Sequence, residues 1–137
     1  MLPAAVRTAL PIIFAFFALC GCKPSWQRQA EAAASHGLND PSSAQFRNIK
    51  LCDRGSGVEG EMNAKNLYGA YTGFRPFIHV DGAQAAVFFQ GEKFDSAPYY
   101  LIAKRCWSDI RWQSEFPDGY PPGLDRKFWQ RLLAAGD

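Results

Sequence analysis

The sequence has few histidines, no excess of either charge and no apolar run long enough to cross a membrane. Only 2 His occur among 137 residues, and 15 Lys and Arg stand against 13 Asp and Glu, a net charge of +2. Because the two signs are interspersed and nearly balanced, the chain lacks the basic surface with which proteins bind nucleic acid. It also lacks a polybasic run that would hold an anionic membrane by itself. No nucleic-acid partner is therefore expected.

Motifs of catalysis and cofactor binding are also missing. There is no G-x-S-x-G turn, no phosphate-cradling glycine loop, no metal-spaced His and Cys cluster and no C-x-x-C pair. We therefore expect a non-enzymatic protein without a metal or cofactor. What is present, 47% hydrophobic and 20% charged residues without internal repeats, is typical of one small globular domain.

The first 21 residues resemble a bacterial lipoprotein signal peptide. Arg7 is their only charged side chain, and the uncharged stretch after it is about 13 residues long, against roughly 20 for a transmembrane helix. The stretch ends in Leu19-Cys20-Gly21-Cys22, which resembles a lipobox: an aliphatic residue, a tolerant position, a small residue and the modified cysteine. Signal peptidase II requires a small residue before the cut, so Gly21 selects Cys22 over Cys20.

We therefore expect a signal peptide over 1–21, a lipidated Cys22 with a helix over 22–39, and a small domain over 40–137. The alternatives are a conventional secreted protein and a signal anchor that is never cut. Stable attachment needs more than one hydrophobic signal, and the several acyl chains of a lipidated Cys22 meet that condition and attach the protein to the membrane. The domain would face the periplasm. Lys23 after the cysteine indicates the outer membrane in a Gram-negative cell.

Cleavage would leave two unmodified cysteines, Cys52 and Cys106, in an oxidising compartment. A bond between them would close a loop of about 55 residues and stabilise the fold by roughly 4 kcal/mol in the chain-entropy treatment. The alternatives are two free buried thiols and a redox pair, and the lack of a C-x-x-C disfavours the redox pair. We predict the disulfide.

Hydrophobic periodicity predicts an α+β fold that begins with a helix and continues as an antiparallel meander of three to four strands. An alanine-rich helix is expected over 23–38, with Ser25 as its N-cap and Gly37 as its stop, and Asp40-Pro41 opens a short second turn. Alternation of polar and apolar residues then predicts four strands, with Asp81-Gly82 as a hairpin turn. The strands are expected over 47–52, 58–65, 74–80 and 83–89.

The second predicted strand carries Val58, Gly60, Met62 and Ala64 on one face and only polar residues on the other. This pattern predicts a sheet with one solvated side. Helices are expected over 99–107 and 124–135, and the Pro- and Gly-rich stretch 109–123 between them is expected to be a loop. The fold would thus close with a C-terminal helix.

Two stretches resemble a widespread set of small bacterial and prophage-encoded proteins. They are residues 40–48, DPSSAQFRN, and residues 60–74, GEMNAKNLYGAYTGF. The pattern of that set is DPxSAxFRN followed by CGEVNAKNxxGGYxGF, and the resemblance implies a shared small α+β domain but no activity. The cysteine that precedes Gly-Glu in the set is Glu59 here. We expect Cys52 to replace it from the neighbouring strand and so to preserve the bridge to Cys106.

Two groups of residues are candidates for function. Glu59, Glu61 and His79 are the ones that a small periplasmic hydrolase or ligand-binding protein would use, since paired carboxylates can act as general acid and base. On a solvated strand face, however, such carboxylates are ordinarily just solvated.

The stretch 63–74 is the more distinctive group, because Tyr and Asn side chains among two glycines are typical of binding loops. Its candidate residues are Asn63, Lys65, Asn66, Tyr68, Tyr71 and Phe74. The alternative is a structural hairpin connection whose rings pack over the sheet. We expect an envelope lipoprotein that binds another protein, either as an immunity- or inhibitor-type protein or as an accessory of an envelope complex.

Overall fold

The computed structural model describes residues 21–91 and 96–135, so that most of the predicted signal peptide, 1–20, lies outside the described residues. The elements in chain order are α1 (Ser25–Ser35), η1 (Pro41–Ser43), β1 (Gln45–Leu51), β2 (Gly57–Asn63), β3 (Arg75–Val80), β4 (Val87–Phe88), α2 (Ala97–Cys106), α3 (Asp109–Glu115) and α4 (Arg126–Ala135). None of the helices in these ranges is long and apolar enough to span a bilayer.

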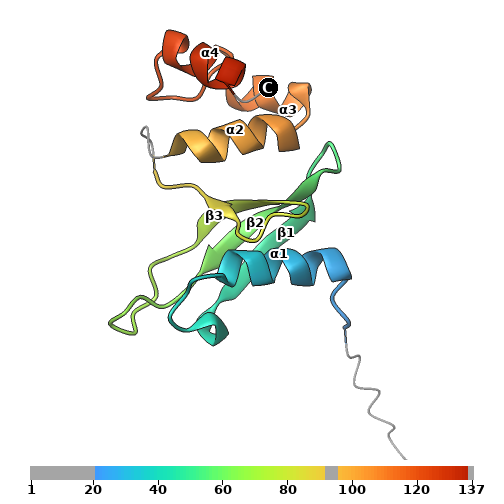
Figure 1. Ribbon diagram of the computed structural model, residues 1–137, viewed down its shortest axis with the longest axis vertical. Coiled ribbons are helices and arrows are strands. Elements are labelled where there is room, and N and C mark those ends of the chain that lie inside the picture. The colour runs from blue at the N-terminus through green and yellow to red at the C-terminus, as the bar shows by residue number, and fades with distance from the viewer. Residues whose placement is uncertain (1–20, 92–95, 136–137) are drawn as a thin grey trace, which may run out of the picture.

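The four strands form one antiparallel sheet in the order β1-β2-β3-β4, which confirms the predicted meander and the α+β class. Figure 1 shows α1 on one side of this sheet and α2, α3 and α4 on the other. The sheet is therefore the middle layer of the fold. Its residues belong to two separate apolar clusters, one on each face.

The first face packs against the alanine stripe of α1. Ala30 and Ala34 are buried against Val58, Met62 and Phe77 of the sheet, and their small side chains let the helix lie close to the strands. This is the face that the alternation in β2 predicts. The predicted stop is also confirmed, since the helix ends at Ser35 and the following Gly37 has a φ of +81°.

The predicted N-cap of α1 is wrong by one residue. Ser25 is the first helical residue, and Pro24 occupies the cap position without a side-chain hydrogen bond. The fixed φ of Pro24, −59°, suits a helix entrance, and its missing N–H costs nothing there. At the second turn the prediction holds, because η1 begins at Pro41 with Asp40 as its cap residue.

The second face of the sheet was predicted to be solvated, and this prediction is wrong. Helices α2, α3 and α4 cover it with a cluster of aromatic side chains, in which Tyr99, Trp112 and Trp129 are 6%, 2% and 3% exposed. The rings of Trp112 and Trp129 stack with centroids 5.6 Å apart, so α3 and α4 are held to each other as well as to α2. As a result, Glu59 of β2 is only 5% exposed.

The stretch 109–123 was predicted to be a loop, but its first half is helix α3. Ser108 caps this helix by accepting a hydrogen bond from the Arg111 N–H at 3.3 Å, a side-chain cap of the usual kind. The high density of Pro and Gly lies entirely after residue 116 and obscures the helix signal before it. The helices predicted over 99–107 and 124–135 are confirmed as α2 and α4.

The predicted disulfide between Cys52 and Cys106 is present, with both cysteines nearly fully buried. It joins the residue after β1 to the last residue of α2, across 54 positions of sequence. A hydrogen bond from the Arg54 N–H to the Cys106 carbonyl, 3.1 Å long, fastens the same two segments. The start of the β1–β2 turn is thereby tied to the helical layer.

Candidate functional site

The connection between β2 and β3, residues 64–74, projects beyond the sheet as an exposed loop (Figure 1). Leu67 and Tyr68 at its tip are 78% and 93% exposed, and Tyr71 is 45% exposed. Side chains as exposed as those of Leu67 and Tyr68 contribute little to the stability of the fold, because most of their surface stays in water. The tip is therefore the feature of the described surface that most resembles a contact site.

The loop is ordered by its own asparagines. The Asn66 side chain accepts hydrogen bonds from the N–H groups of Tyr68 and Ala70 at 3.0 and 3.1 Å, and its main chain pairs with Ala70 at 2.8 Å. Gly69, with a φ of +79°, closes this turn in a conformation that other residues rarely adopt. A rigid loop loses little conformational entropy when its exposed side chains bind.

The six residues predicted for this surface thus fall into two groups. Lys65, Tyr68 and Tyr71 are exposed, while the other three build the loop or pack at its base. Asn63 accepts a hydrogen bond from the Gly73 N–H at 2.9 Å, Asn66 forms the turn, and Phe74 lies under the Arg47 guanidinium at 3.9 Å. The loop also exposes Leu67, which sequence reasoning missed because it weighted aromatic and amide side chains.

Replacing Asn66 with alanine tests whether this side chain orders the loop. We expect a loss of about 1 kcal/mol in the free energy of unfolding, since two hydrogen bonds to main-chain N–H groups disappear. Hydrogen exchange of the amides at 68 and 70 should become faster. Leu67→Ala is the matched control, because Leu67 is 78% exposed and its loss should leave both measurements unchanged. Unchanged exchange in Asn66→Ala would contradict the assignment.

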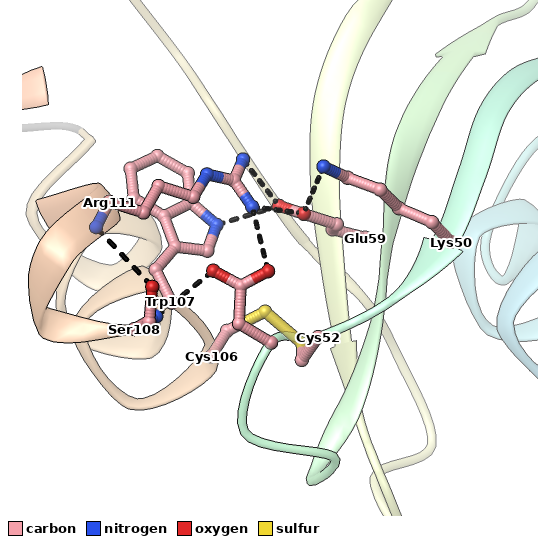
Figure 2. The surroundings of a disulfide bond; sticks show 8 residues. Lys50, Cys52, Glu59, Cys106, Trp107, Ser108 and Arg111 are labelled. Atoms are coloured by element: carbon pink, nitrogen blue, oxygen red, sulfur yellow. Dashed lines mark hydrogen bonds and ion pairs between the residues drawn. A yellow bond between two sulfur atoms is a disulfide. The ribbon is translucent and has the colours of Figure 1, made fainter. Parts of the chain in front are cut away.

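A second cluster of polar groups lies between the sheet and the helices, beside the disulfide (Figure 2). The Trp107 indole N–H donates a hydrogen bond to Glu59 Oε2 at 2.6 Å. The Arg111 guanidinium donates to both carboxylate oxygens of Glu59, to Oε2 at 3.1 Å and also to Oε1. Lys50 from β1 reaches Glu59 Oε1 at 3.1 Å. The carboxylate thus accepts four contacts, which leaves it no free lone pair with which to act as a base.

The surroundings of Glu59 keep its carboxylate ionised. Burial raises the pKa of this group, but hydrogen bonds from Arg111, Trp107 and Lys50 outweigh the burial, so that the pKa lies below its usual value. The guanidinium of Arg111 lies 4.1 Å from the Trp107 ring centre and 3.8 Å from Asp53, whose carboxylate accepts the Ser108 N–H at 3.0 Å. These contacts fasten α3 to the sheet and give Glu59 a structural role.

Acidification should destabilise the fold through these carboxylates. The pKa values of Glu59, Glu61 and Asp53 are all lower than those of free carboxyl groups. Their ionised forms therefore stabilise the fold fully at a pH above the pKa of an unfolded carboxyl group, about 4. This stabilisation is lost as the pH falls through that value and below. We expect the unfolding temperature to be level near neutrality and to drop in that range. A flat profile down to pH 3 would contradict the assignment. The double variant Glu59→Leu/Arg111→Met should show a shallower drop, since the buried carboxylate is gone.

Glu59, Glu61 and His79, the residues of the hydrolase alternative, are not brought together. Glu59 and Glu61 share the face covered by α2 and α3, whereas His79 lies opposite Val58 and so on the face covered by α1. Glu61 is paired with Arg47 at 2.8 Å, and His79 Nε2 lies 2.9 Å from the Ala83 carbonyl. Within the described ranges, no group of three or more His, Cys, Asp or Glu side chains is placed to hold a metal ion.

A shallow cleft opens next to Glu59. One wall comes from a bulge in β1, where the register with β2 shifts between Arg47 and Lys50 and Asn48 adopts a φ of +54°. Asparagine tolerates this conformation, and its side chain donates to Glu61 at 2.7 Å. Tyr99 lines the opposite wall, and burial raises its pKa so that the hydroxyl stays neutral. The charged groups that face the cleft are already paired with one another.

Comparisons of the chain with protein-family models, with curated proteins and with solved structures found no match.

Proposed function

We propose that the chain is a lipid-anchored protein of the bacterial cell envelope whose role is to bind another protein. Cys22 carries the lipid, and the partner is the target of an immunity- or inhibitor-type protein or a component of an envelope complex. In support, Cys22 is exposed and unpaired in the segment before α1, where a lipid on its sulfur would meet no part of the fold. The buried disulfide also suits an oxidising compartment.

The observation that carries the binding role is a rigid scaffold whose most exposed large apolar side chains lie at two places. One is the tip of the β2–β3 loop, and the other is Ile110 on α3, which is 83% exposed. The disulfide and the Glu59 cluster hold α3 firmly on the sheet, so Ile110 is presented on an ordered support. Exposed apolar groups on ordered supports bind partners at little cost in conformational entropy.

The two stretches that resemble the small bacterial and prophage proteins contact each other in the fold. Ser43 of the first stretch accepts the Lys65 N–H at 3.2 Å, and Gln45 accepts the Asn63 side-chain amide at 3.3 Å. The first stretch covers η1 and the start of β1, and the second covers the end of β2 and the whole loop. We propose that the shared pattern specifies this corner of the fold and the loop that it supports.

The lipid anchor is tested by blocking signal peptidase II with globomycin and by the variant Cys22→Ser. We expect the drug to cause the precursor to accumulate, and the variant to incorporate no labelled fatty acid, because it lacks the thiol that would carry the lipid. Lys23→Ala is the control for a change next to the cut and should remain lipidated. A Cys22→Ser protein that still incorporates labelled fatty acid, or a precursor that is processed normally under the drug, contradicts the anchor.

The binding role is tested by photo-crosslinking in the intact cell. A photoreactive amino acid replaces Tyr68 or Ile110, both of which are so exposed that the replacement leaves the fold intact, and Ser56 in the β1–β2 turn serves as an exposed polar control. We expect a discrete protein adduct from position 68 or position 110 and none from position 56. The absence of any protein adduct from both positions would contradict a protein-binding role.

A further inference from the structure

The predicted anchor and the exposed loop lie at the same end of the molecule. In Figure 1 the segment that precedes α1, the η1 turn and the β2–β3 loop all reach the lower end, and α3 and α4 form the opposite end. A flat surface placed against the lower end would meet the anchor segment and the loop together. Helix α3, which carries Ile110, would then lie at the end away from that surface.

The tether between the anchor and the fold is short and partly fixed. Only Lys23 and Pro24 separate Cys22 from the first residue of α1, a span of about 10 Å at full extension. The Lys23 ammonium pairs with Glu31 at 2.8 Å, and the Lys23 carbonyl accepts from Arg28 at 3.1 Å, so this residue is bound to the surface of α1. A lipid on Cys22 therefore holds the lower end of the domain against the membrane surface.

The chemistry of the loop suits that surface. Leu67 and Tyr68 offer an apolar side chain and an amphipathic ring, and rings of that kind are enriched where the bilayer meets water. No acidic residue occurs between Glu61 and Asp81, whereas Lys65 and Arg75 are basic and exposed. Basic side chains near a membrane are attracted to anionic lipid headgroups.

We infer that the loop is a second membrane contact, in which Leu67 and Tyr68 insert into the headgroup region of the bilayer that holds Cys22. This rests on the proposed lipid anchor, because a chain without it has no membrane within reach of the loop. Two contacts, the lipid and the loop, fix the orientation of the domain. The end that carries α3 and Ile110 then faces away from the membrane and is the one that meets the protein partner.

The test uses the mature lipidated chain in vesicles of phosphatidylethanolamine and phosphatidylglycerol, with the photoreactive amino acid at position 68 or at position 110. Irradiation should attach phospholipid at position 68 and about tenfold less at position 110, and phosphatidylcholine vesicles should lower the yield at 68 several-fold because the attraction of Lys65 and Arg75 is lost. Equal yields at the two positions, or no lipid adduct at 68, would overturn the inference.

A matched variant and a mass measurement separate this inference from the proposed function. The variant Lys65→Gln/Arg75→Gln should fold normally and lose the preference for anionic vesicles, since both side chains are exposed. Mass spectrometry of the starting protein establishes whether Cys22 carries lipid. If it does and position 68 yields only protein adducts in cells, the loop binds a protein and the membrane contact is wrong. If Cys22 carries no lipid, the anchor itself is wrong.

Discussion

Replacing Glu59 with alanine is expected to lower the free energy of unfolding by about 3–5 kcal/mol. The carboxylate is 5% exposed and is the common acceptor for Trp107, Arg111 and Lys50. Its removal leaves a buried indole N–H without a partner and takes the main counter-charge from a guanidinium that is held against the Trp107 ring. Most of the loss in stability comes from these donors being left without acceptors, and less from the lost attraction between the carboxylate and the guanidinium.

Chemical denaturation of the purified domain measures this cost, and Glu61→Ala provides the matched control. Glu61 lies on the same strand and face, two residues away, and also pairs with an arginine, but Arg47 is largely exposed. Its replacement should cost no more than about 1 kcal/mol. Similar losses in the two variants would contradict the buried role of Glu59. The double variant Glu59→Leu/Arg111→Met should recover part of the loss, since it removes the unpaired guanidinium but leaves the Trp107 indole N–H without an acceptor.

The role of Glu59 shows why part of the fold could be predicted from the sequence and part could not. The strands follow from alternation, and the α1 face follows from Val58, Gly60 and Met62, because both patterns are local. Whether the polar face of β2 meets water depends on helices that follow some forty residues later, and no local pattern records that contact. Sequence reasoning therefore placed Glu59 on a solvated face, although Trp107 and Arg111 cover it.

The candidate loop shows the same division. Its position and its glycines could be predicted, since Gly69 and Gly73 both adopt positive φ values in the connection between two strands. The roles of Asn63 and Asn66 could not be separated from that of Tyr68, because an asparagine that orders a loop and one that binds a partner look alike in sequence. Only the hydrogen bonds of the folded loop distinguish them.

Removing the disulfide by Cys52→Ala/Cys106→Ala is expected to cost roughly 4 kcal/mol, the chain-entropy value for a closed loop of this length. Both cysteines are buried, at 5% and 2% exposure, so the loss of their packed sulfur atoms adds to the entropic term. Chemical denaturation of the oxidised protein and the double variant measures the difference. A loss below about 1 kcal/mol would show that the bond does not restrain the unfolded chain.

The disulfide and the Glu59 cluster should act as one unit, because both join the same end of α2 to the same end of the β1–β2 pair. Cys106 and Trp107 are adjacent, so the bridge that holds the first also positions the indole that donates to Glu59. We therefore expect Glu59→Ala to cost less in the disulfide-free variant than in the bridged protein, since residues that share a restraint couple by about 0.5–3 kcal/mol. A double-mutant cycle of the four proteins measures this coupling. Strict additivity would show that the hydrogen bonds of Glu59 form equally well without the bridge, and that the disulfide acts on the unfolded chain alone.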